Sequence, residues 1–195
     1  MPEVGDAYGG CRRRVGELVG ALTEEQAAAK VPACPSWTVH DVCAHLAGVV
    51  DDAINGRLDG VATEPWTDAQ VEARRGVPLA EILAEWDEKA PVFEGLLDAV
   101  GMRGRQAVTD AVSHEHDLRG ALGAPGARQS DAVGIAYGFL VPALVDSASV
   151  KGLSLRVEDP EGDGAGDDDA RIVLSGNRFE LVRAMTGRKS AAQVR

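Results

Sequence analysis

Two residues one helical turn apart, Asp110 and His114, are spaced to bind one metal ion together. In a helix, the i, i+4 spacing places the carboxylate and the imidazole on the same face. His116, two residues further on, points nearly the opposite way and is a poor candidate. His45 follows Val42 at i+3 in another amphipathic segment, so it also faces the interior. Two imidazoles and one carboxylate form an open ligand set for catalytic zinc, with a position left for water or substrate.

The spacing leaves the ion and the role of these residues open. Nitrogen and carboxylate ligands also accept nickel, iron or manganese. An interior His45 can simply be a hydrogen-bonded core residue, and an Asp–His pair on one helix can be a local ion pair. A buried Asp110 without a cation would be costly, however, because a desolvated carboxylate needs a partner. That cost favours a metal site.

Three more residues are candidates for supporting roles. Asp117 shares the face of the predicted helical ligands and could orient a ligand or water, or make a helix-surface hydrogen bond. Arg183 and Arg188, near the end of the chain, could bind an anionic substrate or cofactor, because a guanidinium matches a carboxylate. Arginines near a helix C-terminus also favour the helix end without any other role. Trp66 could line a pocket, whereas Trp37 and Trp86 are expected in the core.

Apolar residues at steps of three and four predict the helices that must position these side chains. Two shorter helical pieces are expected, one opened by the capping box Thr23–Gln26 and one near residues 67–75, and a loop is expected at Val31–Pro35. Facing helices of a bundle commonly assemble metal sites. The predicted long helices cover about residues 8–22, 38–58 (capped by Thr38), 79–97 (with Pro91 inside), 105–122 and 130–150 (with Pro142 inside).

The periodicity changes after Gly152. Residues 153–157 and 172–174 alternate like strands, and a short helix is expected over Asn177–Met185. Two strands and one helix bury too little surface alone, so they should pack against the bundle. We therefore expect a mainly α protein, an up-and-down four-helix bundle with an extra helix and a small C-terminal α+β tail. The expected division is a bundle over residues 1–150 and a β-β-α subdomain over 151–195.

Composition narrows the function classes. The chain is 45% hydrophobic and 26% charged, as globular proteins are. A net charge of −11 argues against nucleic-acid binding. Seven acids and no base lie within Glu158–Asp169, which looks like a solvated loop. We see no signal peptide and no apolar run near the length of a membrane span, so we expect a cytoplasmic protein. Cys11, Cys34 and Cys43 lack a CxxC pattern and are expected to be free thiols.

Three segments carry a family resemblance. Residues 31–48, VPACPSWTVHDVCAHLAG, resemble the CPxWTVxDVxAHLAG segment of the mycothiol-dependent maleylpyruvate isomerase family, in the DinB-like superfamily. Residues 110–118, DAVSHEHDL, are similar to that family's carboxylate-x3-His-x2-Asp-Leu segment. Residues 183–190, RAMTGRKS, look like its RxxTGRRS ending. The resemblance implies a DinB-like bundle in which His45, Asp110 and His114 hold a divalent metal, most often with Glu where Asp110 stands.

The resemblance also implies a reaction class. Mycothiol, the small thiol of actinobacteria, would coordinate the metal as its thiolate and react with an electrophilic small molecule, as an isomerase or a thiol transferase. A composition with 16 Arg against four Lys suits an actinobacterial genome. The competing hypothesis is a non-catalytic bundle that binds a metal or ligand as a sensor or partner module, because fold does not settle function. A monomer or a homodimer is expected in either case.

Overall fold

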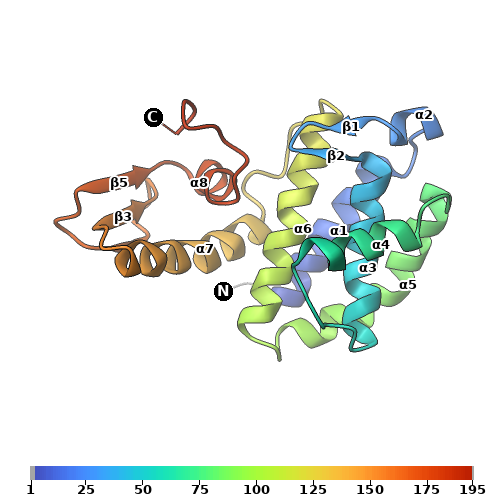
Figure 1. Ribbon diagram of the computed structural model, residues 1–195, viewed down its shortest axis with the longest axis horizontal. Helices are drawn as coiled ribbons and strands as arrows, with labels where there is room; N and C mark the ends of the chain where they lie inside the picture. The colour runs from blue at the N-terminus through green and yellow to red at the C-terminus, as the bar shows by residue number, and fades with distance from the viewer. Residues whose placement is uncertain (1–2, 195) are drawn as a thin grey trace.

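The computed structural model describes residues 3–194, which form a helical bundle and a smaller C-terminal lobe (Figure 1). In the bundle, α3 packs on α5, and α1 packs on both α5 and α6. A small hairpin lies at one end of the bundle, and α4 crosses α3. The elements of this part are α1 (Val4–Val19), α2 (Glu24–Ala27), β1 (Lys30–Val31), β2 (Cys34–Thr38), α3 (Val39–Ile54), α4 (Glu64–Ala73), α5 (Leu79–Leu97) and α6 (Met102–Ala121). This arrangement is the mainly helical bundle that the sequence predicts.

The core consists of the apolar residues that recur at helical spacing. Trp86 on α5 is 1% exposed, and its indole Nε1 donates a hydrogen bond to the Tyr8 hydroxyl of α1 over 3.2 Å. The prediction that Trp86 is a core residue is therefore confirmed. Other fully buried members include Cys11, Val15 and Val19 on α1, Val42, Leu46 and Val50 on α3, Ile82 on α5, and Val108 and Val112 on α6.

The predicted cap at Thr38 fixes the start of α3. The Asp41 amide donates to the Thr38 hydroxyl over 3.1 Å, and the Thr38 amide donates to the Asp41 carboxylate over 2.9 Å. This reciprocal pair satisfies two backbone donors that a helix start leaves free. Because α3 begins there, His45 lies almost two turns inside it, on the buried face. The helix ends at Ile54, four residues before the predicted end, and α1 ends at Val19 rather than at residue 22.

The loop expected at Val31–Pro35 is wrong. Strands β1 and β2 pair there as an antiparallel hairpin, with Val31 opposite Cys34 and Lys30 opposite Thr38. The two prolines suggested a break, but proline is tolerated in edge strands, and this ladder has only two strands. β1 contacts α6, so the hairpin carries Cys34 and Trp37 toward that helix.

The C-terminal lobe is built on α7 (Asp131–Val150), which contacts α6 and α1 on one side and α8 (Arg178–Met185) on the other. A three-stranded sheet of order β4-β3-β5 completes the lobe, with β3 (Leu155–Glu158) antiparallel to β4 (Gly164–Gly166) and parallel to β5 (Ile172–Ser175). The two strands and the helix of the tail were predicted. Because α7 contacts both parts, the division between residues 150 and 151 stays a prediction.

The solvated loop expected over Glu158–Asp169 is only partly right, because the segment contains β4. Asp159 is 5% exposed, and its carboxylate accepts hydrogen bonds from the backbone amides of Glu161 and Asp163 and from the Arg178 guanidinium, over 3.0, 2.9 and 2.5 Å. An arginine from another element can neutralise a buried carboxylate, which local composition does not reveal.

Helix α7 departs from a second sequence expectation. Among residues 3–194 it is the one helix long and apolar enough to cross a membrane by length and composition. It packs against α6, α8, β3 and β4, and 33% of its most apolar window is buried. Length and composition are therefore weak evidence for a membrane span.

Candidate metal centre

His45 of α3 meets Asp110 and His114 of α6 at one point. The Nε2 atom of His45 lies 3.3 Å from Asp110 Oδ2, and Nε2 of His114 lies 3.5 Å from Asp110 Oδ1. One ligand atom from each of the three residues lies within 4.8 Å of the other two. A tetrahedral zinc ion with bonds of about 2.1 Å would hold its ligand atoms about 3.4 Å apart. The three side chains are therefore spaced to share one such ion. The Asp110 side chain is shorter than that of Glu, but it still lies close to both imidazoles.

The three side chains differ in burial, which leaves the site open on one side. The side chains of His45 and His114 are 3% and 8% exposed, whereas that of Asp110 is 37% exposed. The imidazoles are thus held in the packed interior, and the carboxylate faces solvent. A catalytic site needs such an opening, because water or substrate must reach the remaining coordination position.

The neighbouring charges stabilise the ionised form of Asp110. The partial removal of Asp110 from water acts against ionisation, but the imidazoles of His45 and His114 and the guanidinium of Arg188 outweigh this effect and lower the pKa of Asp110 to about 2. For His45, burial lowers the pKa, yet the Asp110 carboxylate and the hydrogen bond to the Gln70 oxygen outweigh burial and raise it. The site therefore presents a carboxylate to any ion it binds, and a proton competes with that ion for His45.

The Nδ1 atom of His45 has a partner that sequence reasoning missed. It lies 2.8 Å from Oε1 of Gln70 on α4, and Nε2 of Gln70 donates to Asp52 Oδ2 over 2.7 Å. Metal-binding histidines generally use their second nitrogen in this way. No local spacing links Gln70 to His45, because the two residues are 25 positions apart on separate helices.

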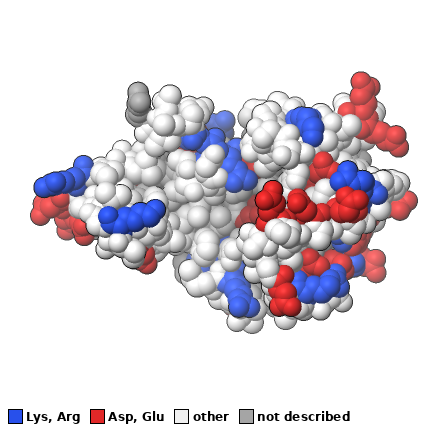
Figure 2. Space-filling view, viewed as in Figure 1, with Lys and Arg blue, Asp and Glu red and all other residues white. Residues whose placement is uncertain are grey.

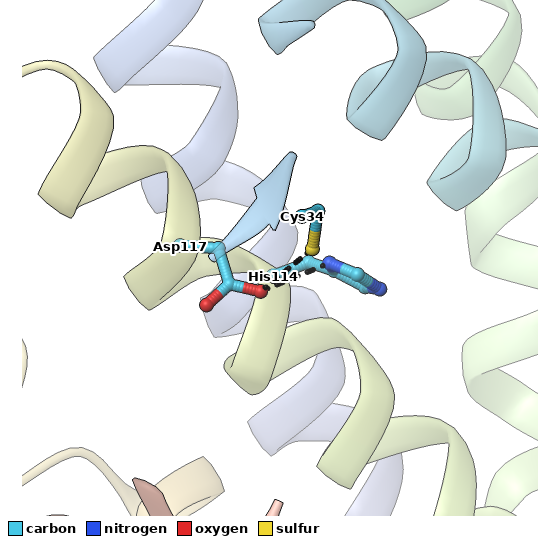
Figure 3. A group of neighbouring side chains, drawn as sticks. All are labelled: Cys34, His114 and Asp117. Atoms are coloured by element: carbon cyan, nitrogen blue, oxygen red, sulfur yellow. Dashed lines mark hydrogen bonds and ion pairs between the residues drawn. The ribbon is translucent and has the colours of Figure 1, made fainter. Parts of the chain in front are cut away.

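Asp117 approaches the other histidine, as one of its two predicted roles required. Its Oδ2 lies 3.3 Å from Nδ1 of His114 and accepts from the Cys34 thiol over 3.5 Å. Figure 3 shows the Cys34 and Asp117 side chains beside the His114 ring. The Asp117 side chain is fully buried, and Nδ1 of His114 has no well-aligned hydrogen bond to any residue of the described chain.

Arg183 and Arg188 both reach Asp117 from the C-terminal lobe. Arg183 Nη1 donates to Asp117 Oδ1 over 2.6 Å and to the Ser113 carbonyl over 3.2 Å, and Arg188 Nη2 donates to Asp117 Oδ2 over 3.0 Å. Figure 2 shows basic side chains where α8 approaches α6. Although burial raises the pKa of Asp117, the nearby His114 imidazole and the hydrogen-bonded Arg188 guanidinium outweigh that effect and hold the pKa well below its usual range. The two arginines thus join the lobe to the site, and anion binding by them stays a prediction.

A second group of possible ligands, Cys34, His114 and Asp117, fits a metal poorly. These residues are also close enough to share an ion. The two guanidiniums already balance the Asp117 carboxylate, and Arg188 Nη2 lies 4.0 Å from the Cys34 sulfur, so a cation there would be repelled. Burial and the charge of Asp117 raise the pKa of Cys34 to about 11, which keeps this thiol protonated. Of the two groups, His45, Asp110 and His114 are therefore the better candidate for a metal site.

The aromatic predictions have mixed outcomes. Trp37, expected in the core, is only partly buried and lies against both ligand imidazoles, with ring centroids 5.1 Å from His45 and 5.7 Å from His114. Trp66 of α4 is also partly exposed and approaches His45 edge-on at 6.5 Å. His116 points away, as expected, and packs on Phe179.

The sequence profile of the mycothiol maleylpyruvate isomerase N-terminal domain matches residues 8–133, more than half of the chain. The chain belongs to this family. The match spans all three proposed ligands and ends at the start of α7. No curated protein matches the sequence.

Two solved structures share the fold. The crystal structure of a histidine-to-alanine mutant of the mycothiol-dependent maleylpyruvate isomerase matches with a TM-score of 0.69 at 12% identity, over 97% of this chain and 91% of that one. A second crystal structure of the mycothiol-dependent maleylpyruvate isomerase matches with a TM-score of 0.62 at 12% identity, over 98% and 91%. The similarity therefore includes the C-terminal lobe. At this identity it establishes the fold of the whole chain.

Proposed function

We propose that this protein is a divalent-metal-dependent enzyme that uses a low-molecular-weight thiol, mycothiol, in isomerase or thiol-transferase chemistry on an electrophilic small molecule. The observation that carries the proposal is the convergence of His45, Asp110 and His114 around one point with an open side. The ligand set suits zinc best and also accepts nickel, iron or manganese. Family membership supports the thiol and the reaction class.

The protein's own thiols support the need for an added one. Burial raises the pKa of Cys43 to about 12 and that of Cys11 well above its usual range, and the pKa of Cys34 is about 11. The thiolate is the nucleophile in thiol chemistry, so none of these cysteines supplies one near neutral pH. A bound divalent ion lowers the pKa of a coordinated thiol and so makes a thiolate available.

The chain's residues would then bind and orient the reactants. Trp37 covers the imidazoles on one side, so reactants must approach from the side of Asp110. Arg188 lies near enough to lower the pKa of Asp110, and its positive charge, with that of Arg183, favours an anionic substrate on this side. Addition of the thiol sulfur to an electron-poor double bond, rotation and elimination would isomerise the substrate with no net change in atoms. Addition alone would give a thiol conjugate.

The second candidate is a non-catalytic module that binds a metal or ligand as a sensor or partner domain. Asp110, where family members more often have Glu, is the observation in its favour. Adding a small thiol to the cobalt-substituted protein separates the two candidates. An enzyme of the proposed kind should give a sulfur-to-cobalt charge-transfer band, whereas bound cobalt without that band would favour the non-catalytic module.

Elemental analysis of the native protein tests the site itself. We expect one equivalent of a divalent metal, and a His114→Ala variant should lose it while keeping its helical circular dichroism. His116→Ala is the matched control, because this buried histidine lies on the same helix and points away from the site. Stoichiometric metal in the His114→Ala variant would refute the ligand assignment.

We further propose that the protein is cytoplasmic, has no nucleic acid or membrane as a partner, and is a monomer or a homodimer.

A further inference from the structure

The Gln70 side chain of α4 contacts the proposed metal ligand His45. Gln70 and His45 are both 3% exposed, and Gln70 Oε1 lies 2.8 Å from His45 Nδ1. The Asp52 carboxylate lies 2.7 Å from Gln70 Nε2. A carboxylate can accept hydrogen bonds but cannot donate them, so Gln70 must turn its amide nitrogen toward Asp52. Its oxygen then faces the imidazole. This chain of contacts defines the orientation of an amide that is otherwise ambiguous.

That orientation determines the tautomer of His45. Because Gln70 offers an acceptor, Nδ1 of the neutral imidazole carries the proton, and Nε2 keeps its lone pair. Nε2 is the atom that lies 3.3 Å from Asp110 and points into the site. Without Gln70, the alternative tautomer could donate from Nε2 to Asp110 and block the lone pair that a metal needs.

Gly48, the last residue of the AHLAG segment, gives Gln70 its room. A Cβ atom on Gly48 would lie 2.6 Å from Gln70 Cβ and 2.7 Å from Gln70 Cγ, closer than carbon atoms approach. One turn further along α4, Arg74 Nε donates to Glu85 of α5 over 2.9 Å, which anchors the helix against the bundle. Helix α4 therefore packs directly against α3 at Gly48, because only a glycine leaves room for Gln70 there.

We propose that Gln70 is a positioning residue that sets the tautomer and orientation of His45 for metal binding, and that Gly48 admits it. The proposal rests on the metal site of the proposed function. It assigns to the short connecting helix a role in building the site, which the family's sequence segments do not include.

The test measures the tautomer and the metal affinity separately. Long-range ¹H–¹⁵N spectra of the metal-free protein at alkaline pH should show His45 protonated at Nδ1. In Gln70→Leu the Nε2-protonated form should appear, and zinc affinity, measured by competition with a chromophoric chelator, should fall about 10- to 100-fold. Zinc affinity within about threefold of wild type in Gln70→Leu, with an unchanged tautomer, would overturn the proposal.

Two variants control for charge and for rescue. Asp68→Asn removes an exposed acid from the same helix and leaves the Asp52–Gln70–His45 contacts in place, so zinc affinity should stay within about threefold of wild type. The double variant Gln70→Glu/Asp52→Asn reverses the acid and the amide and restores the hydrogen-bond chain, so it should recover most of the affinity lost in Gln70→Leu. A loss in Asp68→Asn as large as in Gln70→Leu would contradict a specific role for Gln70.

A second route covers misfolding of Gln70→Leu. Gly48→Ala displaces Gln70 while keeping its amide, and it should change the tautomer and weaken zinc binding, whereas Gly16→Ala, with no atom near the added carbon, should do neither. If wild type binds no zinc, the proposed function fails. The tautomer comparison still decides whether Gln70 positions His45.

Discussion

Replacing Asp117 by alanine tests how much this carboxylate adds to the packing of α7 in joining the C-terminal lobe to the bundle. The Asp117 side chain is fully buried and pairs with Arg183 and Arg188, whose side chains are 14% and 21% exposed. Removing one partner of a buried ion pair costs about 3 to 5 kcal/mol, because the other charge is left without compensation. Since both arginines keep some contact with water, we take the lower end, about 3 kcal/mol.

Thermal unfolding provides the measurement. For a chain of this size, about 3 kcal/mol corresponds to a fall in Tm of about 9 °C. Glu88→Ala, which removes an exposed acid from α5, should change Tm by less than about 2 °C. In a double-mutant cycle, Asp117→Ala and Arg188→Ala should show a coupling energy of about 1 kcal/mol or more, because the two residues are in direct contact.

Two results would refute this reasoning. The first is a Tm of Asp117→Ala within the range of the Glu88→Ala control, which would mean that solvent compensates the arginines fully. The second is strict additivity in the cycle, which would show that the contact contributes nothing of its own. Either result would also mean that the Asp117 ion pairs do not help to hold the lobe beside the proposed metal site.

Two further predictions concern the ends of the fold. Asp159→Asn should destabilise the protein by about 2 kcal/mol at neutral pH. Burial raises the pKa of Asp159, but the hydrogen bond from Arg178 outweighs burial and lowers this pKa. The ionised carboxylate therefore stabilises the fold above the usual carboxyl pKa, and this stabilisation is lost as the pH falls through the pKa of the folded state. Urea unfolding at several pH values checks it, and a difference between variant and wild type that persists in strong acid would contradict the assigned cause. Gly104→Ala should cost about 1 to 3 kcal/mol, because the added carbon would lie 2.2 Å from the Leu97 carbonyl oxygen, whereas Gly16→Ala should be neutral or slightly stabilising. Equal stability of the two glycine variants in chemical denaturation would show that the close approach at Leu97 relaxes freely.

Local rules explain why much of the site could be predicted. The i, i+4 spacing of Asp110 and His114 fixes their common face once α6 is a helix, and the Thr38 cap fixes where α3 begins and thus where His45 points. The apolar periodicity of the long helices likewise determined the bundle. Family segments added the expectation that the three residues share one ion.

Tertiary structure alone decided what surrounds those three ligands. Gln70 reaches His45 because Gly48 lets α4 lie against α3, and Arg183 and Arg188 meet Asp117 because α7 and α8 fold back beside α6. Sequence periodicity specifies directions within one helix, whereas distances between helices depend on how side chains pack across an interface. The amino-acid sequence thus determined the proposed ligand set and its helices, and the packing of α4, the hairpin and the C-terminal lobe determined how that set is oriented, covered and charged.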